Sequence, residues 1–309
     1  MAATERADQV AGLNLISDER RPARRNLWER FAANRVALFS FLFIVALILL
    51  SVFGPVLYQA DPNRQHYEVI NAWPSVTHPL GTDSLGRDTL ARILLGLRVS
   101  LLVAFYVEVL NIAVGASFGL VAGYFGGWVD QLLSRLADML FAFPGLLLAI
   151  LVAAVFGQSV TERFGGVGRL LLVAGSLALV SWPLMARYVR GQTLSLKERD
   201  FVEAARSSGV NNRRIILAHI LPNVAGLIIV SATLDVAAVV VNEAVLSLLG
   251  LGIQPPDPSI GQMIRQGIDY LETNWSQVFF PGLTLTLMVL AFSFTGDGLR
   301  DAFDPFSHR

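Results

Sequence analysis

Polar residues inside apolar stretches are the groups of this chain best able to do chemistry. Glu108 and Asn111 lie three residues apart in one apolar stretch, and Asp235 and Glu243 lie in a later one. An ionisable side chain inside a membrane-spanning helix costs about 2.5 to 3.5 kcal/mol to insert, so it usually faces a protein interior or a water-filled path. Acid–base catalysis, passage of a solute and interhelical hydrogen bonding are the roles open to these residues.

Helical spacing groups these residues into two stripes. Glu108 and Asn111 share one face, while Ser231, Asp235 and Asn242 fall within about 40° on a helical wheel, with Glu243 to one side. We predict that the stripes line a path across a membrane or the seam of a dimer. The alternative is a set of interhelical hydrogen bonds that fix packing, each worth under about 1 kcal/mol.

An enzyme is disfavoured, because no nucleophile and base pair accompanies the three carboxylates. The four histidines, His66, His78, His219 and His308, are expected in different loops, with two of them on opposite sides of the membrane. We therefore predict no metal site. Cysteine is absent, which excludes disulfides and thiolate metal ligands.

A charged segment between two apolar stretches is the second place of interest. Residues from Lys197 to Ser208 are mostly good helix formers. Asp200 is a candidate N-cap with Glu203 three residues later, and Gly209 is placed to terminate the helix. The sequence predicts a short helix outside the membrane.

This short helix has one face that suits docking. Phe201, Ala204, Ala205 and Ser208 recur at spacings of three and four, which makes that face small and apolar and leaves Glu203 free to pair with another protein. The alternative is an amphipathic helix that lies on the bilayer surface.

The elements that position these residues are membrane helices. Apolar residues make up 54% of the 309 residues and charged residues 16%, with a mean hydropathy of +0.56, which is too hydrophobic for a soluble domain. About 20 apolar residues span about 30 Å of hydrocarbon. The predicted all-α protein has six spans: Val36 to Leu57, Val99 to Tyr124, Met139 to Phe156, Leu170 to Ala186, Asn223 to Leu249 and Val278 to Thr295.

Lys and Arg predict the orientation of the chain. They are more frequent in the segments that lie inside when the N-terminus is cytoplasmic, so both termini are expected in the cytoplasm. The predicted organisation is a cytoplasmic arm over residues 1–35, a first span over 36–57, an outside segment over 58–98, a membrane core over 99–300 and a cytoplasmic tail over 301–309.

Two further functions are disfavoured by composition. A phosphate-binding loop needs a lysine after a glycine-rich turn, but the one lysine, Lys197, follows Leu196. The chain is therefore not expected to hydrolyse ATP. A net charge of zero suggests no nucleic-acid surface.

The charged segment resembles the signature of ATP-binding-cassette importer permeases. That signature reads Glu-Ala-Ala, three residues, Gly, nine residues, Ile, any residue and Leu-Pro. Here Glu203 to Ala205, Gly209 and Leu221-Pro222 fall in register, and His219 stands where Ile is usual. Because Ile220 follows at once, the packing of the re-entering helix is expected to persist.

Other stretches resemble the second permease subunit of dipeptide, oligopeptide and nickel importers, over residues from about 34 to 305. Their glycines are expected mainly at turns or caps that need positive φ: Gly81, Gly86, Gly123, Gly126 and Gly127. The matching stretches are His78 to Asp88, Ala122 to Asp130, Leu246 to Pro256, Pro258 to Gly261, Gly296 to Asp301 and Asp304-Pro305.

The resemblance implies a type I importer permease fold with six transmembrane helices, and a cytoplasmic coupling loop over residues 187–222. The residues implied in coupling to an ATPase are Asp200, Phe201, Glu203, Ala204, Ala205, Gly209, Leu221 and Pro222. Glu203 would supply the contact charge and Gly209 the end of the docking helix.

It also implies the partners: a second permease subunit in a heterodimer, two cytoplasmic ATPases that hold ATP and Mg, an extracytoplasmic binding protein, and the lipid of a bacterial or archaeal cytoplasmic membrane. This chain would itself bind no cofactor. Di- or oligopeptides are the expected cargo, and nickel or another small solute is the alternative. A channel that works without ATP is the competitor from another class, and it would not need the loop from Asp200 to Pro222.

Overall fold

The computed structural model describes residues 27–304, and this part of the chain is helical without a strand. Two π-helical turns, Asn111–Ala116 and Ile215–Ile220, and a short 3-10 turn, Tyr67–Val69, interrupt or connect the α-helices. The α-helices are α2 (Leu27–Ala33), α3 (Arg35–Leu57), α4 (Thr89–Leu110), α5 (Ser117–Phe125), α6 (Gly127–Phe141), α7 (Gly145–Leu196), α8 (Asp200–Ser207), α9 (Asn212–Arg214), α10 (Leu221–Leu248), α11 (Ile260–Ile268) and α12 (Ser276–Phe303).

Five helices in the described part are long and apolar enough to cross a membrane. They are Arg35–Leu57, Thr89–Phe125, Gly145–Leu196, Asn212–Leu248 and Ser276–Phe303. The third has 52 residues, or about 78 Å at about 1.5 Å per residue, far more than one crossing needs. It breaks at Gly165, where φ is 63°. The predicted third and fourth spans lie on opposite sides of this break, so six crossings remain the prediction.

Two boundaries around α6 differ from the sequence prediction. The predicted span from Met139 crosses a real interruption, because α6 ends at Phe141 and α7 begins only after Pro144. Proline disfavours helical backbone at the residue before it, which explains the interruption. The expected loop after Phe156 is also wrong, since the helix continues to the Gly165 break.

An ion pair holds α6 against α7. Arg190 Nε and Nη2 donate to the two carboxylate oxygens of Asp130, at 2.5 and 2.6 Å. The hydrogen bond from this guanidinium lowers the pKa of Asp130. This ion pair therefore fixes α6 to α7.

Glycines let α5 and α7 approach closely. A Cβ atom added at Gly119 would lie 2.6 Å from the Ala186 carbonyl oxygen, and one at Gly123 would lie 2.7 Å from Thr193 Cβ. The prediction that Gly123 needs positive φ is wrong, because Gly123 is a helical residue. Its missing side chain permits the close packing of α5 on α7. Positive φ is confirmed for the other four glycines: Gly81, Gly86, Gly126 and Gly127.

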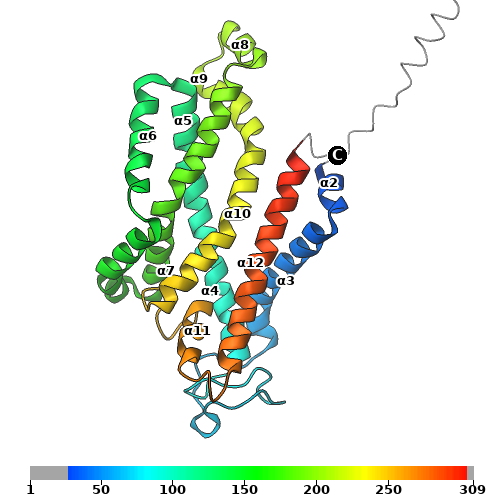
Figure 1. The fold of residues 1–309 in the computed structure, drawn as a ribbon, viewed down its shortest axis with the longest axis vertical. Helices are drawn as coiled ribbons and strands as arrows, with labels where there is room; N and C mark the ends of the chain where they lie inside the picture. The colour runs from blue at the N-terminus through cyan, green and yellow to red at the C-terminus, as the bar shows by residue number, and fades with distance from the viewer. Residues whose placement is uncertain (1–26, 305–309) are drawn as a thin grey trace, which may run out of the picture.

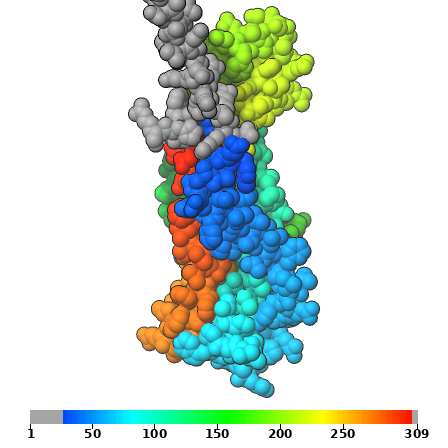
Figure 2. Space-filling view, turned by 90° about the vertical axis from the view of Figure 1, so that its right-hand side faces the viewer, coloured from blue at the N-terminus to red at the C-terminus, as the bar shows by residue number. Residues whose placement is uncertain are grey.

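The core lies where the five long helices meet. Leu47 of α3, Val103 of α4, Val173 of α7, Val240 of α10 and Met288 of α12 are buried in one cluster. Figure 1 shows α8, α9, the α5–α6 turn and the last turns of α12 at one end, which we name the loop end. The segment between α3 and α4 lies with α11 at the opposite end, which we name the outer end. In Figure 2, α3 lies across the face formed by α4 and α12.

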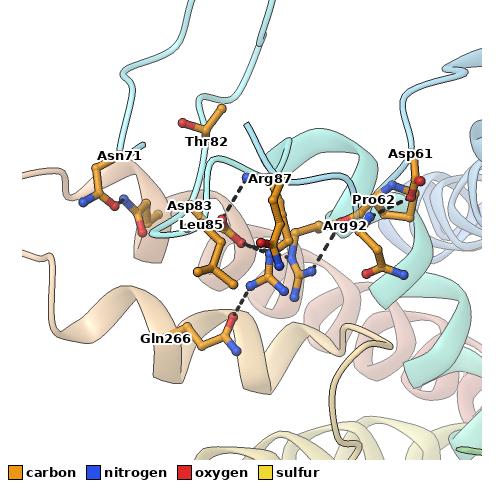
Figure 3. A network of polar contacts seen from close by, with 12 residues as sticks. Asp61, Pro62, Asn71, Thr82, Asp83, Leu85, Arg87, Arg92 and Gln266 are labelled. Carbon is orange, nitrogen blue, oxygen red and sulfur yellow. Dashed lines mark hydrogen bonds and ion pairs between the residues drawn. The ribbon is translucent and has the colours of Figure 1, made fainter. Parts of the chain in front are cut away.

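An ion-pair network organises the outer end (Figure 3). Asp83 Oδ2 lies 2.7 Å from Arg87 Nε and 3.5 Å from Arg92 Nε. Arg87 also donates to Gln266 of α11 at 3.3 Å, and Arg92 donates to the Pro62 carbonyl at 3.3 Å. The motif that follows His78 thus joins the outside segment to α4 and α11.

Asp88 fixes the start of α4. Its Oδ1 accepts the N–H of Ala91 at 2.9 Å, which makes it the N-cap, and its Oδ2 lies 2.8 Å from both Tyr58 Oη and His78 Nδ1. Burial and the neighbouring carboxylate raise the pKa of Tyr58 to about 12. The expectation that all histidines lie in different loops is wrong here, because the ring centroids of His66 and His78 are 6.2 Å apart in one segment. His308 lies outside the described residues.

Candidate functional site

Helix α8 ends in a glycine-dependent cap. The N–H of Gly209 donates to the Arg206 carbonyl at 3.0 Å, and the N–H of Val210 donates to the Ala205 carbonyl at 3.1 Å. This pair of bonds is a Schellman motif, which needs the left-handed backbone that Gly209 adopts at φ 77°. The predicted role of Gly209 as the helix terminator is confirmed.

The start of α8 differs by one residue from the prediction. Arg199 occupies the N-cap position and makes no side-chain capping bond, so Asp200 is the first helical residue and not the cap. Asp200 and Glu203 both lie in the first turn. Carboxylates there interact favourably with the exposed N–H groups of the helix, which explains a helix at this position without a side-chain cap.

Three of the four residues of the predicted docking face of α8 are exposed. Phe201 is 42% exposed, and Ala204, Ser208 and the neighbouring Glu203 are also exposed. Ala205 turns inward and is partly buried against an apolar cluster. The exposed face is therefore narrower than the spacing predicts, because the helix needs its other side for attachment.

Val202 is the main attachment of α8, and the sequence prediction missed it. Its side chain is fully buried in a cluster that includes Val189 of α7, Ile215 of the π turn and Tyr124 of α5. The available signal was an apolar residue three positions before Ala205 in an otherwise charged helix. Val202 and Ala205 form the inner side of α8.

Tyr124 extends the attachment to the end of α5. Its hydroxyl donates to Asn212 Oδ1 of α9 at 2.8 Å, and the Arg206 guanidinium carbon lies 5.9 Å from its ring centroid. The latter distance is within the range of a cation–π contact. A displacement of α8 would therefore act on α5 as well as on α7.

Leu221 and Pro222 lie inside a continuous helix. The π turn Ile215–Ile220 comes directly before them, and Pro222 lies on the exposed surface. Proline lacks an N–H group and crowds the carbonyl four residues earlier, so a wider turn accommodates it. Ile220 is fully buried, which confirms that the helix keeps its packing although His219 replaces the usual Ile.

Two of the predicted polar residues within the spans meet directly. Asn111 Nδ2 of the first π turn donates to Asp235 Oδ2 of α10 at 2.8 Å. Ser181 of α7 donates to Asn111 Oδ1, also at 2.8 Å. The sequence predicted both stripes but neither this contact nor Ser181, because the register between the helices depends on tertiary packing.

Glu108 lies beside this pair. Its side chain adjoins Asp235 and Asn111 and is only 7% exposed. Among the described residues, no hydrogen bond to its carboxylate oxygens meets strict geometric limits, although Asp235 and Asn111 are within interaction range. Glu108 and Asp235 therefore form a pair of adjoining acids within the spans.

Glu243 has a different environment on the same helix. It accepts the hydroxyls of Ser100 at 2.9 Å and Ser247 at 2.7 Å, and Ser259 donates to Ser247 at 3.0 Å. These bonds join α4, α10 and the residue before α11. They are the interhelical hydrogen bonds expected if Glu243 serves to fix helix packing. Asn242 is partly buried and makes no hydrogen bond to the other predicted residues in the described part.

Ser231 and Asp235 line a groove of about 420 Å³ on the surface of the spans. Tyr188 of α7 and Arg300 of α12 line it as well. The structure thus divides the predicted stripes into a groove that contains Ser231 and Asp235, an acid behind it, Glu108, and a buried packing site at Glu243. No cluster of three or more His, Asp or Glu residues in residues 27–304 has the arrangement of a metal site.

The chain matches two protein families. Residues 115–309 match the family described as binding-protein-dependent transport system inner membrane component. Residues 24–74 match the N-terminal transmembrane domain of oligopeptide transport permease C. Together the two matches cover α3 and residues 187–222, and they leave out residues 75–114, which contain Glu108 and Asn111.

Curated proteins are similar over nearly the whole chain. The glutathione transport system permease protein GsiD of Pectobacterium atrosepticum is 39% identical over 302 residues, which is 97% of each chain. The dipeptide transport system permease protein DppC of Alkalihalophilus pseudofirmus is 38% identical over 281 residues, covering 91% of this chain and 89% of that protein.

A solved structure shares the fold. The MetNI methionine ABC transporter in an inward-facing conformation aligns with a TM-score of 0.54 at 19% identity, covering 69% of this chain and 97% of that chain. This similarity supports the helical permease fold that the sequence predicts.

Proposed function

The chain belongs to the family of binding-protein-dependent transport permeases, and we propose that it forms, with a second permease chain, the path for short peptides through an ATP-binding-cassette importer. The relatives are transport permeases and not enzymes. Those named for dipeptide and glutathione transport support peptides as the cargo class. Nickel or another small solute is the less favoured cargo.

The observation that carries this function is the construction of α8. Its exposed face, with Phe201 and Glu203, is available to an ATPase, while Val202 is fully buried on its inner side. Two cytoplasmic ATPases that bind ATP and Mg would push on such helices when they close. Val202 is buried in one apolar cluster with residues of α5, α7 and α10. That push would therefore move the spans between two packed arrangements.

The remaining partners follow from this arrangement. A binding protein outside the membrane would deliver peptide to the outer end, where the segment between α3 and α4 is fixed by the Asp83 network. ATP would drive the cycle through its different affinity for the two conformations of the complex. The expected location is the cytoplasmic membrane of a bacterium or archaeon, with the loop end inside.

Reconstituted vesicles test this function. Labelled dipeptides, longer peptides and nickel are offered to the complete complex, with and without ATP, for the native chain and for Glu203→Arg. We expect ATP-dependent uptake of peptide, and a loss of at least about tenfold in the variant because a docking carboxylate becomes a cation. Glu29→Arg, which reverses an exposed acid on α2, is the control away from both α8 and the outer end.

The results discriminate between the functions. Uptake of nickel but not of peptide would change the cargo and keep the importer. Transport that needs no ATP and is unaffected by Glu203→Arg would replace the importer with a facilitator.

A further inference from the structure

A second groove lies at the loop end, between α2, α3 and α12, and we name it the tail groove. In Figure 1, α2 lies beside the last turns of α12. The tail groove has a volume of about 480 Å³, and its lining side chains are apolar except for two threonines. One wall consists of the rings of Trp28, Phe31 and Phe41, whose centroids lie 5.8 to 6.2 Å apart.

The tail groove has the dimensions of a single hydrocarbon chain. Its lining follows α12 from Phe292 to Phe303, about 16 Å along the helix, which is close to half of a hydrocarbon core of about 30 Å. Its volume over that length gives a mean cross-section of about 30 Å², less than half that of an α-helix about 10 Å across. An extended peptide would leave its backbone groups unpaired at this depth. A lipid tail has neither restriction.

The mouth of the tail groove is positively charged. Leu27 and Trp28, which line it on α2, are 51% and 60% exposed, and tryptophan favours the membrane–water interface. Residues 20–35 of the sequence contain six arginines and one acid, Glu29. Asp301 and Asp304 at the end of α12 offset only part of this charge. The mouth therefore suits an anionic group.

Arg30 supplies a donor at this mouth. Its Nη1 donates to the Asp304 carbonyl at 3.4 Å, which places the guanidinium between α2 and the end of α12. Its Nε is buried without a hydrogen-bond partner in residues 27–304. A guanidinium is well suited to phosphate, because its N–H groups match the phosphate oxygens.

We infer that the tail groove binds one acyl chain of an anionic phospholipid, with the lipid phosphate beside Arg30. Arginines directly cytoplasmic of a span attract the anionic lipids of the inner leaflet, and the first span begins at Arg35. The acyl chain would fill the space between α3 and α12 that the side chains leave open. This inference depends on the proposed orientation, with the loop end inside, and not on the cargo.

Photo-crosslinking in nanodiscs tests the site. The complete complex is placed in bilayers with a small, fixed fraction of phosphatidylglycerol that carries a diazirine in its acyl chain. Labelled residues of this chain are identified by mass spectrometry, with phosphatidylcholine and then phosphatidylglycerol as the bulk lipid. Labelling from Phe292 to Phe303 should fall at least about fivefold in bulk phosphatidylglycerol, the factor expected for one arginine near the surface. Labelling of Leu49 and Phe53, which are about half exposed on α3 outside the groove, should not change.

Two variants separate the head group from the tail. Arg30→Gln should lower groove labelling in bulk phosphatidylcholine about fivefold, because the phosphate loses its cation. Arg213→Gln is the matched control, since Arg213 is an exposed arginine of α9 at the same end. Thr233→Phe serves if Arg30→Gln does not assemble. It places a ring in the groove from α10, and it should lower labelling by phosphatidylglycerol and phosphatidylcholine probes alike.

Three outcomes would overturn the lipid site. The first is groove labelling that is equal in the two bulk lipids or unchanged in both variants. The second is an unlabelled groove in a complex whose Leu49 is labelled, because protein would then cover it. The third is groove labelling that appears only after residues 1–19 are deleted, which would make the N-terminal arm the occupant.

Discussion

At the loop end of the molecule, α8 is held by the buried Val202, by Ala205 and by contacts of Arg206 with Tyr124, and most of its surface is exposed. At the outer end, the segment between α3 and α4 is joined to α4, α11 and α12 by polar bonds. In that network Asp83 contacts two arginines, and Asn274 Nδ2 donates to the Asn71 carbonyl at 3.0 Å.

The difference fits the roles that we propose for the two ends. An element with few attachments can move at low cost, whereas a segment fixed by interlinked buried bonds keeps its shape. The loop end is therefore suited to receive a displacement, and the outer end is suited to present a constant surface. Three substitutions test this contrast.

The largest expected effect is at the outer end. Asp83→Ala leaves Arg87 and Arg92 without their carboxylate although their side chains are only 7% and 2% exposed. Breaking a buried ion pair costs about 3 to 5 kcal/mol, and amide hydrogen exchange in residues 58–88 should accelerate accordingly. ATPase activity in the complex should stay coupled to uptake.

Glu68→Ala removes an exposed carboxylate from the same segment and is the control for Asp83→Ala. Equal exchange rates in the two variants would show that the Asp83 network does not hold the outer end.

An intermediate effect is expected at the loop end. Gly209→Val places a β-branched residue at φ 77°, which costs about 1 to 3 kcal/mol and disrupts the cap of α8. Uptake per ATP hydrolysed should fall, while hydrogen exchange at the outer end should remain native. Gly191→Val, at an exposed position inside α7 with open space around it, is the control. Intact coupling in Gly209→Val would contradict the role of this cap.

A smaller effect is expected when a single attachment of the loop end is removed. Tyr124→Phe deletes the hydrogen bond to Asn212 and keeps the ring, at a cost of about 0.5 to 1.5 kcal/mol. Exchange of the α8 and α9 amides should accelerate modestly, and coupling should weaken less than in Gly209→Val. Tyr106→Phe is the control, because it removes the same hydroxyl group from an exposed position on α4. If both tyrosine variants behave alike, Tyr124 does not attach the loop.

Most of the helical architecture follows from local sequence properties. The first span, predicted from Val36 to Leu57, is α3 at Arg35–Leu57, because a long apolar run satisfies its own backbone in lipid. The errors occur at Pro144 and Gly165, where two residues change the backbone direction inside an apolar stretch. Hydropathy does not respond to such positions, since both neighbouring segments remain apolar.

Composition, helical period and cap residues act locally, so they were enough to predict the membrane class, the short helix at Asp200, its glycine terminator and the polar residues of each stripe. Packing between distant segments sets which side of α8 is buried, through Val202, and which acids meet. Asp235 and Glu243 look alike as carboxylates on one apolar helix, yet one lies in a groove beside Glu108 and the other is bonded to serines of neighbouring elements. That distinction depends on the register between helices distant in sequence, which side-chain packing sets.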